Sequence, residues 1–193
     1  AERDGRKELV VSVSTKGSEA ARLAEVLVRQ GIEVLRTTET DELRLVPYDG
    51  DDERRVTLPA GSFRIPFEQS SYLLVRSLLD PHTPMDEAFL EQERERLERG
   101  QNNRFYDVTA WSLVFTFGVE AYTSSRRLDV ASERIETTEQ VRAPIAAVVR
   151  PATVGWIVPY DDNASIEALL ACWREGLVVE TVLDAFTHDG RRL

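Results

Sequence analysis

Residues 8–37 carry the pattern that most constrains the fold of this chain. The apolar, β-branched run ELVVSVS (8–14) predicts a buried strand, and IEVLRT (32–37) predicts a second one. Between them, Ser18 can cap a helix over 19–30. The apolar residues of that helix recur at the i, i+3, i+4, i+7 spacing: Ala20, Leu23, Ala24 and Leu27. Because the links are short, this βαβ unit predicts parallel strands joined by a right-handed crossover.

The same pattern returns 145 residues later along the chain. The corresponding pairs are Asn163 with Ser18, Cys172 with Leu27 and Gly176 with Gly31, and the matching strands are VGWIVP (154–159) and LVVETV (177–182). We therefore expect one α/β region cut from a longer protein, with a longer first repeat over residues 1–130 and an incomplete second repeat over 131–193. The expected fold class is α/β, with duplicated βαβ units in a mainly parallel, doubly wound sheet.

Further elements are expected between the two repeats. GSFRIPF (61–67) predicts a strand, and SSYLLVRSLLD (70–80) predicts a helix. Thr83 and Pro84 open another helix that ends at Gly100, and its charged residues predict a solvated surface helix.

The stretch YDVTAWSL (106–113) places an acid, hydroxyls and a tryptophan close together. Asp107 stands where an N-cap belongs, before a helix expected over 108–117 and buried on nearly every side. Hydroxyls form one stripe along it at Thr109, Ser112 and Thr116. Trp111 is expected to pack in the core. We therefore interpret Asp107, Thr109 and Trp111 as a structural motif and not as a catalytic cluster.

Charge and composition restrict the partners of the chain. Asp and Glu number 34 against 24 Lys and Arg, which gives a formal charge of −10. Such a surface repels duplex nucleic acid and anionic membranes, so neither is expected as a partner. The sequence has no apolar run long enough for a membrane span. The compartment stays open, and a periplasmic or secreted parent would carry its signal upstream.

Residues for catalysis or metal binding are scarce. The chain has two histidines, His82 and His188, and neither has a second ligand at metal-binding spacing. Cys172 is expected on the apolar face of a helix, so it predicts a core residue and not a nucleophile. We therefore assign no catalytic, cofactor-binding or metal-binding residue, and the segment itself is not expected to be an enzyme.

One loop has the residue types of a ligand site. STKGSE (14–19) joins a strand to the start of a helix and offers Ser14, Lys16 and Ser18. It lacks the glycine and lysine spacing of a phosphate-binding loop, and an ordinary capped turn is the simpler interpretation. A small-ligand module that uses the βα loops at 14–18 and 159–163 stays open as an alternative function.

Three stretches together carry a resemblance to a known family. They are PAGSFRIPFEQSSYLLVRSLLD, FLEQERERLERG and FYDVTAWSLVFTFGVEAY. In this order the chain resembles the C-terminal, non-catalytic region of large zinc carboxypeptidase-like metallopeptidases of the carboxypeptidase A type. Two positions depart from the family pattern, since Ser70 and Val114 stand where proline is common.

The resemblance implies a function and a fold. The implied function is an accessory region that packs beside and supports an upstream peptidase domain of the same chain, with a parent that is a zinc metallocarboxypeptidase. Zinc and its ligands would belong to that upstream domain, so no cofactor is expected in this segment. The implied fold is similar to class I glutamine amidotransferases, a flavodoxin-like architecture. A free-standing enzyme is a third, less favoured hypothesis.

Overall fold

A seven-stranded sheet forms the centre of the structure, which is a computed structural model. The structure describes residues 5–81, 87–101, 112–142, 155–158, 160, 163–182, 184–188 and 191–192. The strand order is β4-β3-β6-β1-β5-β2-β7. The strands are β1 (Glu8–Val11), β2 (Val34–Thr37), β3 (Asp41–Pro47), β4 (Arg54–Leu58), β5 (Phe63–Pro66), β6 (Ala121–Ser124) and β7 (Ser132–Ile135). A separate ladder pairs β8 (Thr187–His188) with β9 (Arg191–Arg192).

Every neighbouring pair in the large sheet is antiparallel, so the expected mainly parallel, doubly wound α/β sheet is wrong. The cause is β5, which lies between β1 and β2 and pairs with both. Leu9 of β1 faces Ile65 of β5, and Arg36 of β2 faces Phe63. The expected likeness to a flavodoxin-like, class I glutamine amidotransferase fold is wrong for the same reason.

The predicted strand–helix–strand connection at 8–37 is nevertheless present. β1 and β2 run in the same direction and are joined by α1 (Gly17–Arg29), but one strand separates them. The order β6-β1-β5-β2, with helices after β1 and after β5, is the split β-α-β-β-α-β arrangement. The β3–β4 hairpin is inserted between β2 and β5 and extends the sheet beyond β6, and β7 extends it beyond β2.

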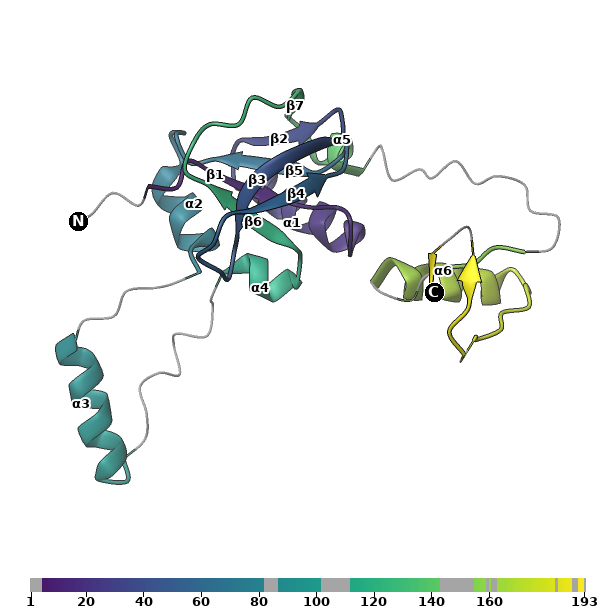
Figure 1. The fold of residues 1–193 in the computed structure, drawn as a ribbon. Helices are drawn as coiled ribbons and strands as arrows, with labels where there is room; N and C mark the ends of the chain where they lie inside the picture. The colour runs from purple at the N-terminus through teal and green to yellow at the C-terminus, as the bar shows by residue number, and fades with distance from the viewer. Residues whose placement is uncertain are drawn as a thin grey trace.

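Helices α1, α2 (Tyr72–Leu79), α4 (Leu113–Phe117) and α5 (Thr138–Arg142) cover one face of this sheet. The structure also describes α3 (Glu87–Glu98) and α6 (Asn163–Arg174), which contribute no residue to the core on that face. The main core joins Leu23 and Leu27 of α1 to Leu9, Phe63 and Ile65 of the strands, and α2, α4 and α5 contribute to the same cluster. Helix α3 lies apart from the sheet (Figure 1).

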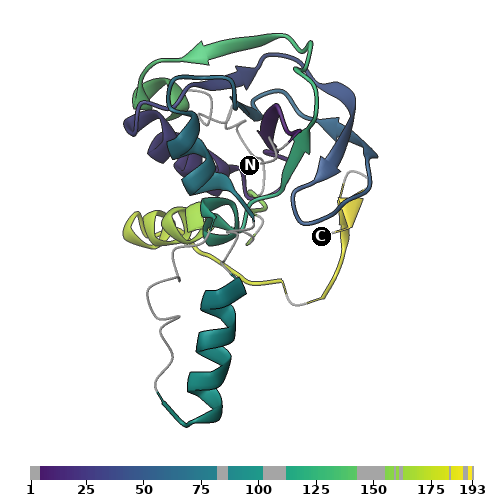
Figure 2. The same ribbon diagram turned by 90° about the vertical axis from the view of Figure 1, so that its left-hand side faces the viewer.

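A smaller core fills the opposite face. Val10 and Tyr122 of the central strands pack there against Leu45 and Leu58 of the β3–β4 hairpin and against Leu128. Figure 2 shows the hairpin and the helices α1 and α2 on different sides of the molecule. Because strand residues alternate between faces, Phe63 and Ile65 point to the helices while Arg64 points to this second core.

An ion pair is buried on that second face. Arg64 donates from Nε and Nη2 to the two carboxylate oxygens of Glu8, at 2.9 Å each. The remaining donors of Arg64 reach the carbonyls of Leu128 and Val130 and the hydroxyl of Ser132, and the backbone N–H of Leu128 donates to Glu8. The side chains of Arg64 and Glu8 are 4% and 1% exposed. The pair therefore fixes the segment after β6 against the central strands.

The second predicted repeat is only partly present. Helix α6 occupies the expected place, and Gly31 and Gly176 both adopt φ 73° and end their helices. The strands expected over 154–159 and 177–182 do not form in the described parts, 155–158 and 177–182. Cys172 is half-buried, whereas Leu27 is fully buried. The division into repeats at 1–130 and 131–193 stays a prediction.

The buried ion pair yields the first prediction. Glu8→Ala leaves the Arg64 guanidinium buried without a counter-charge, and such a loss costs about 3–5 kcal/mol. Glu42→Ala is the matched control, because it breaks the exposed Arg55–Glu42 pair at 3.5 Å and should cost at most about 1 kcal/mol. Urea denaturation of both variants measures the difference. Equal unfolding free energies for the two variants would contradict the role of the pair.

Candidate functional site

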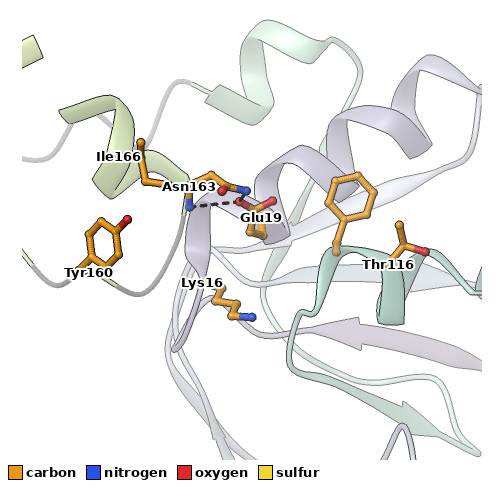
Figure 3. Close-up of a pocket in the computed structure, with 7 residues that line it drawn as sticks. Lys16, Glu19, Thr116, Tyr160, Asn163 and Ile166 are labelled. Carbon is orange, nitrogen blue, oxygen red and sulfur yellow. Dashed lines mark hydrogen bonds between the residues drawn. The ribbon is translucent and has the colours of Figure 1, made fainter. Parts of the chain in front are cut away.

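A cleft of about 430 Å³ opens where three helices meet (Figure 3). It lies between the start of α1, the end of α4 and the start of α6. Its lining residues are Lys16, Glu19, Thr116, Phe117, Tyr160, Asn163 and Ile166. The volume is within the usual range for small-molecule sites. This cleft is the candidate functional site.

Lys16 enters the cleft from an unusual backbone conformation. It is the N-cap of α1, with φ 48° and ψ 46°, and it is the one non-glycine residue of the described chain with positive φ. Its ammonium lies beside Gly118, where a Cβ would stand 3.1 Å from Lys16 Nζ. Gly118 itself ends α4 with φ 60°. A glycine at 118 thus provides the left-handed turn and also leaves room for the Lys16 side chain.

Polar contacts attach α6 to α1 at the edge of the cleft. Asn163 donates from Nδ2 to Glu19 Oε1 at 2.5 Å, and its backbone N–H reaches the same oxygen at 3.4 Å. One turn further along, Arg22 pairs with Glu167 at 2.6 Å. Glu19 is only 7% exposed, whereas Arg22 and Glu167 are largely in solvent. The Glu19–Asn163 contact is therefore the stronger link between the two helices.

The three residues predicted to bind a ligand, Ser14, Lys16 and Ser18, lie in different parts of the structure. Lys16 lines the cleft, and so do Tyr160 and Asn163 of the predicted loop at 159–163. Ser14 lies elsewhere, since its hydroxyl donates to Glu120 Oε2 at 2.5 Å. Ser18 lies inside the first turn of α1, and Lys16 takes the N-cap position that Ser18 was expected to hold. The cleft thus uses one of the three predicted residues.

Ser14 belongs to a small polar network around Glu120. The carboxylate of Glu120 also accepts a hydrogen bond from the Tyr122 hydroxyl, and Arg54 lies over the Tyr122 ring at 5.5 Å. Burial acts to raise the pKa of Glu120, but the hydrogen bonds from Ser14 and Tyr122 and the charge of Arg54 outweigh it and lower the pKa. A carboxylate held ionised in this way serves as a fixed acceptor, so we assign the network a structural role.

The structure describes the last two residues of the YDVTAWSL motif, Ser112 and Leu113. Ser112 is the N-cap of α4, and its hydroxyl oxygen accepts a hydrogen bond from the backbone N–H of Val114 at 3.2 Å. The prediction of one continuous helix over 108–117 is therefore wrong, because α4 begins at Leu113. Thr116, a member of the hydroxyl stripe, donates to the Ser112 carbonyl at 3.3 Å. Phe115 is 51% exposed, which contradicts burial on nearly every side. Asp107, Thr109 and Trp111 lie outside the described residues.

A buried tyrosine ties this motif to the rest of the fold. The Tyr48 hydroxyl donates to the Leu79 carbonyl at 2.8 Å and is hydrogen-bonded to Ser112 Oγ. Burial raises the pKa of Tyr48 to about 12, and the charge of Asp80 adds to the rise while the hydrogen bond with Ser112 opposes it. The contacts join the end of β3, the end of α2 and the start of α4.

The described part of the chain lacks the features of a metal site and of a membrane span. No group of three or more His, Cys, Asp or Glu residues there could hold a metal ion. No helix among the described residues has the length and apolar character of a membrane span. His82 lies outside the described residues, and His188 is placed in β8.

Several residues of the cleft have no direct signal in the sequence. Glu19 was one acid among many, and Thr116 and Phe117 belonged to a helix interpreted as buried. Asn163 is the counterpart of Ser18 in the repeat and the last residue of the candidate loop at 159–163, but no side-chain contact could be assigned to it. No family model, curated protein or solved structure matches the chain. The function of the cleft is therefore inferred from its own residues.

Tyr48 yields a prediction about alkaline pH. Its pKa in the folded protein is about 12, above the value of about 10 for a free tyrosine. The folded state therefore holds the phenol proton more tightly, and this contribution to stability is present below about pH 10 and is lost as the pH rises toward 12. Tyr48→Phe should lose less stability over that range than the parent chain. Denaturant unfolding between pH 8 and pH 11 measures both, and parallel pH profiles would contradict the prediction.

Proposed function

We propose that this chain is a non-catalytic accessory unit that packs beside and supports the peptidase domain of a zinc carboxypeptidase-like metallopeptidase. Zinc and the catalytic residues would then belong to the peptidase domain, and the chain would act through its surfaces. The proposal begins from the resemblance carried by the three motifs, and the structure supplies a surface suited to such packing.

The observation that carries the proposal is a set of exposed apolar side chains among the described residues of segment 155–182. The large side chains left in solvent there are Trp156, Ile157, Val158, Tyr160, Ile166, Leu170, Trp173, Leu177, Val178, Val179 and Val182. On α6, Ile166, Leu170 and Trp173 follow one another at helical spacing and continue the surface along the helix. Apolar side chains gathered in this way are typical of a surface that another protein domain covers.

Described residues from two of the three motifs have structural roles in the fold, which suits an accessory unit. The segment PAGSFRIPF contains β5, whose Phe63 and Ile65 are buried in the main core. Ser112, at the end of YDVTAWSL, caps α4 and is hydrogen-bonded to Tyr48. These residues position elements of the fold and do not converge on a reactive group.

The proposal is tested by binding between this chain and the domain encoded upstream of it. We expect that domain to contain an H-x-x-E motif and a distant histidine, and to bind the purified chain. Trp173→Asp combined with Val178→Asp should weaken binding at least tenfold, because a charge placed in an apolar interface must be desolvated. Analytical ultracentrifugation of the mixed proteins measures the affinity.

A matched control shows whether binding depends on residues 155–182 or on any exposed apolar side chain. Leu73 on α2 is 80% exposed, comparable to Val178 at 89%, but it lies outside residues 155–182. Leu73→Asp should leave the affinity unchanged. An upstream region without the peptidase motif, no binding, or equal losses in both variants would each refute the accessory role.

A small-ligand module is a second candidate, because one observation favours it. Lys16 from the loop at 14–18 and Asn163 from the loop at 159–163 line the same cleft. A ligand that binds the native state raises its apparent stability, so a thermal-shift screen of small molecules tests this candidate. The two candidates share Tyr160 and Ile166, which line the cleft and also belong to the exposed apolar set. Their tests use different variants and ligands, so each can fail without the other.

A further inference from the structure

Two opposite charges line the cleft without pairing with each other. Lys16 and Glu19 are three residues apart and both border the same space, yet no ion pair joins them. Glu19 uses Oε1 for both of its hydrogen bonds, and Oε2 takes none among the described residues. Lys16 Nζ likewise has no hydrogen bond or ion pair within the described part of the chain. The cleft thus presents a separate anion and a separate cation.

The environment of Glu19 makes its missing counter-charge significant. The residue is 7% exposed, and its one protein partner, Asn163, is neutral. A carboxylate removed from water is stabilised by a cation that supplies both charge and hydrogen bonds. Figure 3 shows the Asn163 side chain on the α6 side of Glu19 and the Lys16 amine directed away from that contact. A ligand cation at Oε2 would complete the coordination of the Glu19 carboxylate.

The remaining walls of the cleft add an apolar contact. Phe117 borders it from the end of α4, and Ile166 borders it from α6, where 40% of the isoleucine is exposed. A simple anion such as phosphate would pair with Lys16 but would be repelled by Glu19. A simple amine would pair with Glu19 but would be repelled by Lys16. A ligand that carries both charges and an apolar group satisfies all three walls.

We propose that this cleft binds a free α-amino acid with an apolar side chain. The ammonium of the amino acid donates to Glu19 Oε2, and its carboxylate accepts from Lys16 Nζ. Its side chain lies against Phe117 and Ile166. The inference rests on the second candidate function, the small-ligand module, and is independent of the accessory role.

Lysine NMR tests the contact directly, because the chain has lysines only at positions 7 and 16. Reductive methylation with ¹³C-formaldehyde keeps their charge and gives each a separate signal. Titration with L-phenylalanine should shift the Lys16 signal and leave that of Lys7, which pairs with Glu68 outside the cleft, in place. 2-Phenylethylamine, which lacks the carboxylate, and 3-phenylpropanoate, which lacks the ammonium, should bind at least tenfold more weakly.

Two variants each remove one charge of the cleft while keeping the local backbone and hydrogen-bond geometry. Lys16→Gly removes the ammonium while glycine accepts the positive φ without strain, and Glu19→Gln keeps an oxygen for Asn163. Each should weaken L-phenylalanine binding about tenfold in calorimetry, the size expected for one lost charge-assisted hydrogen bond. Lys7→Gln is the matched control and should bind as the parent does.

The outcomes distinguish this inference from the function on which it rests. An unmoved Lys16 signal, equal binding of the two single-charge analogues, or full affinity in Lys16→Gly would overturn the amino-acid assignment. If a different compound class then stabilises the chain in the thermal-shift screen and loses that effect in Lys16→Gly, the ligand module stands and only the amino-acid class is wrong. If no compound stabilises the chain, both fail.

Discussion

The Glu8–Arg64 ion pair is the interaction on which the arrangement of the sheet depends. It joins the two central strands, β1 and β5, at a face where both charges are shielded from water. Every donor of Arg64 that the carboxylate does not use is taken by the chain after β6, at Leu128, Val130 and Ser132. Since buried charges are tolerated only when fully paired, this geometry holds strands and covering segment in one register. It also explains why a polar pair can be buried on the sheet face that carries the smaller apolar core.

Local patterns in the sequence identified the elements more successfully than their pairing. The runs around β1, α1, β2, β5 and α2 were each predicted in type, because apolar period and end signals are local properties. The insertion of β5 between β1 and β2 depends on contacts between distant residues, which a local pattern does not contain. The hairpin β3–β4 was missed although it had a signal. Its strands alternate polar and apolar residues, with Leu43 and Leu45 on one and Val56 and Leu58 on the other, around a turn that contains Asp-Gly.

The candidate site also depends on contacts between distant residues, which local sequence patterns do not contain. Lys16 and the loop at 159–163 could be selected from the sequence because each stands before a helix, whereas Glu19, Thr116 and Phe117 could not. Glu19 becomes significant only because α6 covers it and supplies Asn163, a contact between residues 144 positions apart. Thr116 and Phe117 reach the cleft because α4 starts at Leu113 and is a short helix that ends at Gly118. Chemistry at this site is thus created by helix packing and not by a contiguous motif.

The two outer strands of the sheet limit how other proteins can approach this chain. On β4, Arg54 and Arg55 are exposed, and on β7, Glu133 and Arg134 are exposed. Charged side chains along an edge oppose the addition of a further strand from another molecule, because the new strand would have to bury or displace them. Growth of the sheet by intermolecular β-pairing, which leads to aggregation or to strand exchange, is therefore disfavoured at both ends. A partner is left with side-chain surfaces, such as the apolar side of α6, and such contacts can form without any change in the backbone of the sheet.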